Sequence, residues 1–156
     1  MCKFYADSML GKLSRFLRFL GYDTLYRTQE SINEMLETAR EEDRIILTRS
    51  DEIIQMCKKR NLHNLFITNI EVSEQLKEIK ASFSLNIVYP PSKMRCSVCN
   101  DDLKVRNKEE IIDKIPEGTE KNYNDFWECR GCFKIYWMGS HWQDIKKTIS
   151  EINSSE

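Results

Sequence analysis

Two hydrophobic patterns follow each other repeatedly along residues 1–92. Short apolar runs predict buried strands, and longer segments with apolar residues at helical spacing predict amphipathic helices. The strands are expected at 3–6, 23–26, 45–48, 65–67 and 86–89. The helices are expected at 9–20, 31–40, 51–60 and 71–83. Because strand and helix alternate before a last strand, the order predicts an α/β fold, a parallel sheet flanked by helices on both faces.

The alternation ends at Pro90-Pro91-Ser92, because two successive prolines stop a sheet and stiffen the chain. We therefore expect one domain over residues 1–92 and a second over residues 93–156. The second domain is expected to contain a polar stretch at 100–128, a strand at 133–137, a helix at 140–152 and a frayed end at 153–156.

Two C-x-x-C pairs in the second domain predict a structural zinc site. Cys96 with Cys99, and Cys129 with Cys132, each place two thiolates on one tight turn, and two such turns complete a tetrahedral set. A closed four-thiolate site leaves no position for water, so this zinc is expected to stabilise the fold and not to catalyse. Redox pairs or disulfides are the alternative, but both pairs lie outside the alternating region and nothing marks the chain as secreted.

The composition is typical of a globular protein with nearly balanced charge. Of 156 residues, 40% are hydrophobic, and 24 Lys+Arg against 25 Asp+Glu leave a net charge of −1. No apolar run has membrane-spanning length, and Lys3 and Asp7 interrupt any signal-peptide core. A cytoplasmic location is therefore expected. Because the net charge is close to zero, a nucleic-acid site would have to be a local patch.

Four acidic residues mark the carboxyl ends of the predicted strands, where parallel sheets carry their functional crevice. Asp7 follows the first strand, Asp51 and Glu52 follow the third, and Glu34 begins the second helix. Carboxylates in such positions suit Mg²⁺ or Mn²⁺, which can activate water for attack at phosphorus. Structural alternatives exist, because Ser31 and Glu34 match a capping box, while Asp51 and Glu52 also favour a helix N-terminus.

Basic side chains near these carboxylates suggest contact with a phosphate backbone. Lys12, Arg15 and Arg18 share the polar face of the first helix, and Arg49 follows the third strand. Such cations would neutralise the phosphate charges of a nucleic-acid strand that runs along this face. The solvated face of an ordinary amphipathic helix has the same pattern.

A second group near the C-terminus combines aromatic and polar side chains. Trp137, His141 and Trp142 lie within one short segment that follows the second cysteine pair. Aromatic rings of this kind can stack on bases. Packing of the second domain on the first explains the same residues equally well.

Long motifs spanning residues 3–142 resemble a known family. The segment ADSMLGKLSRFLRFLGYDT at 6–24 closely resembles the opening of the Mut-seven C-terminal RNase domain family. The similarity continues through RIILTR at 44–49, both cysteine pairs, and YWMGSHW at 136–142. The resemblance implies a PIN-like domain followed by a small four-cysteine zinc ribbon, and a metal-dependent ribonuclease.

The resemblance also implies roles for individual residues. Asp7 matches the family's first acidic position, and Glu34 matches the acidic cluster that opens the second helix. With Asp51 they would hold Mg²⁺ or Mn²⁺, while Lys12, Arg15 and Arg49 would contact RNA. The family usually reads Thr-Arg-Asp after the third strand, whereas Ser50 stands here in place of the Asp.

Three functional hypotheses remain at this point. The first is an RNA-hydrolysing enzyme with a carboxylate-held divalent cation. The second is a non-catalytic module that binds RNA, a ribosomal surface or a protein, and Ser50 favours it because a lost carboxylate weakens cation binding. The third is a toxin-like nuclease held by an antitoxin, which the zinc ribbon and the lack of a visible partner segment disfavour.

Overall fold

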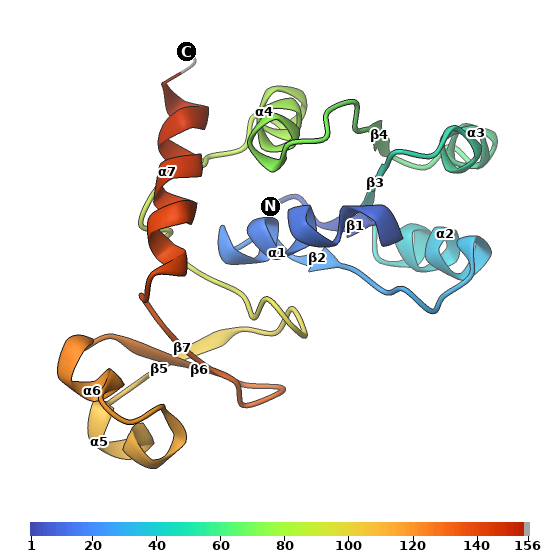
Figure 1. Cartoon of the computed structure of the whole chain (residues 1–156). Helices are drawn as coiled ribbons and strands as arrows, with labels where there is room; N and C mark the ends of the chain where they lie inside the picture. Colours follow the sequence, from blue (N-terminus) through green and yellow to red (C-terminus); the bar gives the residue numbers. More distant parts are fainter. Residues whose placement is uncertain (155–156) are drawn as a thin grey trace.

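The computed structural model describes residues 1–154, and its first part is a four-stranded parallel sheet (Figure 1). The strands are β1 (Phe4–Ala6), β2 (Thr24–Leu25), β3 (Ile45–Thr48) and β4 (Asn64–Phe66), in the order β2-β1-β3-β4. The parallel arrangement confirms the α/β fold predicted from the alternating pattern. The strands remain parallel, but the order in which the chain adds them reverses between β1 and β3. In parallel sheets, such a switch in strand order places a crevice at the carboxyl ends of the strands.

Helices cover both faces of this sheet. They are η1 (Ser8–Leu10), α1 (Gly11–Phe19), α2 (Ile32–Glu41), α3 (Asp51–Lys59) and α4 (Val72–Phe83). Successive strand residues point to opposite faces, so Phe4 packs with α1 and α4 while Tyr5 packs with α2 and α3. The sheet is therefore the middle of three layers, and every helix of this part begins near the carboxyl ends of the strands.

The predicted strand at 86–89 is wrong, because this segment has no strand partner. The Asn86 carbonyl accepts a hydrogen bond from the Tyr22 hydroxyl at 3.0 Å, and the Ile87 carbonyl accepts one from the Asn153 side-chain amide at 3.0 Å. Ile87 is buried because it packs in the core that α4 shares with the C-terminal helix. A short apolar run signals burial, and burial alone does not require a strand.

The second part is a three-stranded antiparallel ribbon. Its strands are β5 (Leu103–Arg106), β6 (Phe126–Cys129) and β7 (Ile135–Trp137), in the order β5-β6-β7. Short helical turns between β5 and β6 are α5 (Lys108–Ile111), η2 (Ile112–Lys114) and α6 (Thr119–Asn122). The strand expected at 133–137 is confirmed as β7. The polar composition of 100–128 did not indicate β5, because Lys104 and Val105 are both exposed and give no apolar face.

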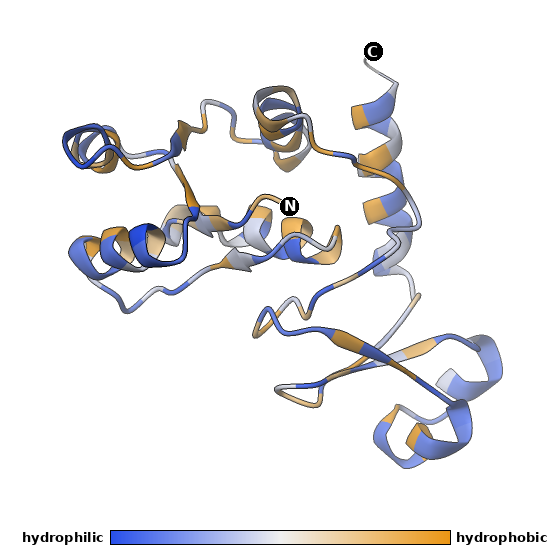
Figure 2. Ribbon diagram, turned by 180° about the vertical axis from the view of Figure 1, so that it is seen from behind, coloured by the Kyte–Doolittle hydropathy of each residue, from blue (hydrophilic) through white to orange (hydrophobic). Residues whose placement is uncertain are grey.

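The C-terminal helix α7 (His141–Asn153) packs back onto the first part of the chain. Ile149 and Ile152 are buried in the core of α1 and α4, and Figure 2 shows the apolar side of α7 turned toward α4. The division into 1–92 and 93–156 stays a prediction. Asn153, expected to fray, ends the helix, and residues 155–156 lie outside the described residues. No helix within residues 1–154 is long and apolar enough to cross a membrane.

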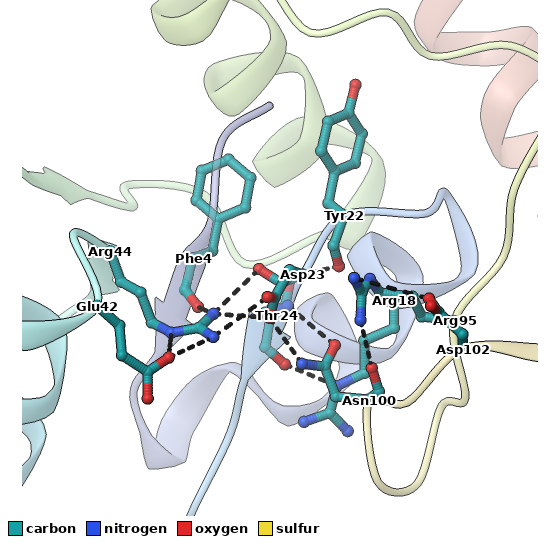
Figure 3. A network of polar contacts seen from close by, with 10 residues as sticks. All are labelled: Phe4, Arg18, Tyr22, Asp23, Thr24, Glu42, Arg44, Arg95, Asn100 and Asp102. Atoms are coloured by element: carbon teal, nitrogen blue, oxygen red, sulfur yellow. Dashed lines mark hydrogen bonds and ion pairs between the residues drawn. The ribbon is translucent and has the colours of Figure 1, made fainter. Parts of the chain in front are cut away.

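A polar network joins the ribbon to the free edge of the sheet (Figure 3). Thr24 lies in the edge strand β2, where one side of the backbone has no strand to pair with. Its amide donates to Asn100 Oδ1 at 3.0 Å, and its carbonyl accepts from Arg18 Nε at 2.8 Å. Arg18 Nη1 also donates to the carbonyls of Ser97 and Val98, inside the first cysteine turn. The cysteine turn therefore closes an edge that would otherwise be open to another chain.

Asp23 holds two parts of this network, and its replacement by Asn should destabilise the protein. It accepts from Arg44 Nη1 at 2.7 Å and from Asn100 Nδ2 at 2.8 Å. Arg44 is almost fully buried and is paired with both Asp23 and Glu42, so the loss of one of its two carboxylate partners is expected to lower the free energy of unfolding by about 2 kcal/mol in urea titrations. The matched control is Glu37→Gln, which breaks surface ion pairs with Arg40 and Arg60 and should cost less than about 1 kcal/mol.

The same substitution makes a prediction about pH. Burial disfavours the charged form of Asp23, but hydrogen bonds from Arg44 and Asn100 outweigh it and hold the pKa below the ordinary value of 3.8. A carboxyl with a lowered pKa stabilises the fold above its unfolded pKa and loses that contribution as pH falls through the folded pKa. The stability gap between native protein and Asp23→Asn should be constant near neutrality and shrink as pH falls below 3.8. A gap that widens in acid would contradict this assignment.

Candidate functional site

Asp7 is a buried carboxylate at the point where the strand order reverses. It directly follows β1, and one further step of the β1–β3 register places it beside Thr48. The Thr48 hydroxyl and the Arg49 amide, at 3.2 Å, both donate to Asp7 Oδ2, and the Met9 amide donates to Oδ1 at 2.8 Å. The side chain is 4% exposed. Three donors from two strand ends therefore orient this carboxylate before any ligand binds.

Glu34 adopts the capping-box arrangement that was its structural alternative. The Ser31 amide donates to Glu34 Oε2 at 2.7 Å, and the Glu34 amide donates to Ser31 Oγ at 3.3 Å. The hydrogen bond from the Ser31 backbone is the main cause of a lowered pKa for Glu34. The exposed side chain lies at the start of α2, on the edge of the sheet that carries Asp7. Its assignment as a metal ligand stays a prediction.

Asp51 and Glu52 are exposed in the first turn of α3, and Ser50 is the N-cap of that helix. Ser50 Oγ accepts from the Ile53 amide at 3.4 Å, and the Ser50 amide donates to Thr48 Oγ1 at 3.0 Å. Ser50 is therefore hydrogen-bonded to Thr48, and Thr48 in turn donates to Asp7. Since Asp and Ser cap helices about equally well, a carboxylate at position 50 would be compatible with this helix start.

The four candidate carboxylates do not gather into one cluster. Within residues 1–154, only the four cysteines form a group of three or more potential ligands close enough for one ion. Mg²⁺ is often held by one or two carboxylates, with waters and substrate phosphates filling its other positions. A cation held by Asp7 and one further acid therefore stays a prediction.

The basic candidates divide into two groups. Lys12 and Arg15 are exposed on α1. Arg49 is partly exposed, and its backbone amide donates a hydrogen bond to Asp7. Arg18, which was expected on the same open face, is 4% exposed and holds the first cysteine turn. That expectation was wrong because the ribbon covers the end of α1, a contact between segments far apart in the sequence.

Sequence patterns did not reveal one acid that contacts a side chain of β1. Glu30 precedes the N-cap of α2 and accepts a hydrogen bond from the hydroxyl of Tyr5. Tyr5 shares a face of β1 with Asp7, because the two residues are two positions apart. Burial, followed by this hydrogen bond, raises the pKa of Tyr5. The only available signal was an acid next to a capping box, and that signal is too common to select a site.

The four cysteines form a compact cluster that fits a zinc ion. Their Sγ atoms all lie within 4.8 Å of one another. Cys96 Sγ is 3.5 Å from Cys132 Sγ, and Cys99 Sγ is 3.3 Å from Cys129 Sγ. A tetrahedral ion with Zn–S bonds of about 2.3 Å requires sulfurs about 3.8 Å apart. Spacing, number and donor type therefore agree with the predicted four-thiolate site.

Hydrogen bonds around Cys96 favour its thiolate form, whereas burial opposes the thiolate form of Cys129 and Cys132. The Cys99 amide points to Cys96 Sγ at 3.5 Å, the Cys132 amide points to Cys129 Sγ at 3.4 Å, and the Tyr136 hydroxyl lies 3.0 Å from Cys96 Sγ. Burial alone would raise the pKa of Cys96, but these hydrogen bonds lower it to about 6. Burial raises the pKa of Cys129 to about 12, a cost that a bound dication would offset.

The aromatic segment near the C-terminus has two different environments. Trp142 is buried, donates from Nε1 to the Trp137 carbonyl at 2.6 Å, and packs its ring 4.1 Å from that of Phe19. It joins the ribbon to α1, as the packing alternative expected. Trp137 is only partly buried and His141 is exposed, and both line a cleft between α1 and the ribbon.

Comparison with known proteins identifies one family over nearly the whole chain. The sequence model of the Mut7-C RNAse domain matches residues 2–149. Neither a curated protein nor a solved structure matches the chain. The matched range contains the Asp7 crevice, the start of α3 and all four cysteines.

Proposed function

We propose that this chain, which belongs to the Mut7-C RNAse domain family, hydrolyses RNA phosphodiester bonds with Mg²⁺ or Mn²⁺ held at the crevice between β1 and β3. The observation that carries the proposal is Asp7, a buried carboxylate oriented by Thr48, Arg49 and Met9 where the strand order reverses. The family match supports RNA as the substrate. The four free thiols of the cluster suit a reducing compartment such as the cytoplasm.

Each residue of the crevice has a defined part in this proposal. Asp7 would hold the cation, Asp51 or Glu34 would add a second carboxylate, and Glu52 would extend the acidic edge. A divalent cation bound there supplies the Lewis acidity that activates water and offsets charge on the phosphate oxygens. The exposed cations Lys12, Arg15 and Arg49 would hold the RNA backbone in register with Asp7.

Cleavage of an end-labelled single-stranded RNA tests the proposal directly. Native protein in Mn²⁺ should shorten the RNA, and the same protein without added Mn²⁺ or Mg²⁺ should not. The divalent cation is omitted and not chelated, because a chelator would also remove zinc from the cysteines. Zinc content is measured in both samples. Uncleaved RNA across a range of cations, with full zinc content, would overturn the nuclease proposal.

Restoring a carboxylate at position 50 should strengthen cation binding. Ser50→Asp keeps a good N-cap for α3 and adds a negative charge two residues from Thr48. We expect the Mn²⁺ concentration for half-maximal cleavage to fall about tenfold, with unfolding free energy unchanged within about 0.5 kcal/mol. Ser50→Asn, an equally good cap without charge, is the matched control. Equal Mn²⁺ dependence in both variants would place the cation away from the start of α3.

A second candidate function is an RNA-binding module without catalysis. Ser50 in place of the family's usual Asp favours it, together with the capping role of Glu34. In that case native protein and Asp7→Asn would bind RNA equally, and neither would cleave it. Binding and cleavage measured on the same preparations separate the two functions.

A further inference from the structure

A cleft lies between α1 and the ribbon. Its volume is about 550 Å³, within the range of small-molecule sites. Phe16 and Arg15 line it from α1, Trp137 and Lys134 line it from the ribbon, and His141 lines it from the start of α7. In Figure 1, β7 runs from the ribbon directly into α7, so these side chains come from three parts of the chain.

The charge of the cleft differs from that of the whole protein. The chain carries 25 Asp and Glu residues against 24 Lys and Arg. Within the described residues, Arg15, Lys134 and His141 line the cleft and no carboxylate does. A cleft with cationic side chains and no acid favours an anionic occupant and disfavours a basic one.

Two of the residues that line the cleft, Trp137 and Tyr123, each carry a side-chain hydrogen-bond donor. The Trp137 indole Nε1 and the Tyr123 hydroxyl both lie near Gly139, where a Cβ would stand 3.2 Å and 3.9 Å from them. Across residues 1–154, neither group has a hydrogen-bond partner, although indole and phenol groups usually find one when buried. Both rings are only partly buried. Flat aromatic surface, free donors and nearby cations together suit a nucleotide, which offers a base to stack, acceptors and a phosphate.

From these observations we infer that the cleft binds one nucleotide of a single-stranded RNA, with its base against Trp137 and its phosphates near Arg15 and Lys134. The inference rests on the proposed function, because that function names RNA as the substrate. It adds a second contact point for the strand, away from the cleaved bond. Arg15 joins the two points, since it lines the cleft and lies on α1, which follows η1 and its N-cap Asp7.

The spacing along α1 sets the distance between the two contact points. Arg15 is eight positions after Asp7, which corresponds to about 12–15 Å along η1 and α1. A strand in the cleft would therefore reach the crevice after a few nucleotides. RNAs too short to span both points should be cleaved less efficiently, mainly through a higher KM.

Binding is measured with the Asp7→Asn protein, so that RNA stays intact. The probe is a fluorescein-labelled single-stranded RNA of about a dozen nucleotides, followed by anisotropy. Trp137→Leu keeps an apolar side chain but loses the stacking surface, and we expect its Kd to rise about tenfold. Trp137→Phe keeps an aromatic face and should stay within about threefold of the parent Kd. The hydrogen bond from Trp142 uses the Trp137 backbone carbonyl, so either variant retains it.

The charged part of the cleft is tested by salt dependence. Arg15→Ala and Lys134→Ala should each reduce the slope of log Kd against log salt by about 1, as expected for a lost phosphate contact. Lys59→Ala removes an equally exposed cation at the end of α3 and should leave the slope unchanged. Zinc content and unfolding temperature are recorded for every variant, because a damaged ribbon would change both.

The outcomes separate this inference from the proposed function. Cleavage by native protein, with Kd unchanged in Trp137→Leu and the salt slope unchanged in Lys134→Ala, would overturn the inference and leave the nuclease intact, because neither residue has a part in the proposed crevice. Cleft-dependent RNA binding without cleavage by native protein would support the inference and reject the nuclease. If an oligoglutamate peptide lost affinity in Trp137→Leu while RNA did not, the cleft would be a protein site, and the inference would be wrong.

Discussion

Replacing Asp7 with Asn is expected to abolish RNA cleavage while leaving the zinc ribbon loaded. Asn keeps the size of the side chain but removes the charge that would hold the divalent cation. A bound cation contributes several kcal/mol to stabilising the reaction's transition state, so the rate constant should fall by about 100-fold or more. Single-turnover cleavage of labelled RNA in Mn²⁺ measures the effect.

A structural effect of the same substitution must be separated from a chemical one, because Asp7 accepts three hydrogen bonds in a buried position. Asn can still accept from Met9, but its amide would face the donors Thr48 and Arg49, so some loss of stability is expected. Thr48→Val removes one of these donors without removing the charge. It should lower stability by about 1–2 kcal/mol and retain most of the cleavage. Equal loss of cleavage in Thr48→Val and Asp7→Asn would show that orientation of the carboxylate, or folding itself, limits activity.

Removing zinc is expected to unfold the ribbon and expose the edge of the sheet. Structural zinc sites bind with apparent free energies of about 10–16 kcal/mol, comparable to or larger than the stability of a whole domain. Two carbonyls of the first cysteine turn accept hydrogen bonds from Arg18, and Asn100 accepts one from the Thr24 amide. Unfolding of this turn would therefore free the backbone of β2. We expect chelation to give loss of ordered ribbon structure by circular dichroism, a lower unfolding temperature, and aggregation through the exposed edge.

Single cysteine replacements localise this effect. Cys129→Ser should reduce bound zinc below one ion per chain and reproduce the chelated state. Cys2→Ser is the matched control, because Cys2 lies outside the cluster and should leave zinc content at one ion per chain. Full zinc content in Cys129→Ser, or stability unaffected by chelation in native protein, would contradict a structural role for the metal.

The sequence by itself determined the features that depend on local pattern. Hydrophobic periodicity placed the first four strands and their helices, because each element needs its own apolar face whatever its neighbours are. The C-x-x-C spacing predicted the four-cysteine cluster, since two close cysteines on a tight turn can present both sulfurs to one ion. The position of Asp7 after the first strand followed from the order of elements alone.

Where a local pattern allowed two roles for the same residue, only the tertiary structure decided between them. Glu34 read either as a metal ligand or as part of a capping box, and the fold shows the capping box. Arg18 read as a surface cation, and the ribbon buries it. The segment at 86–89 read as a strand because it is an apolar run, but only Ile87 of that run is fully buried, in the core that α4 shares with α7. These cases share one physical reason. Burial and hydrogen bonding depend on segments distant in sequence, and a local pattern cannot specify which distant segment will pack against it.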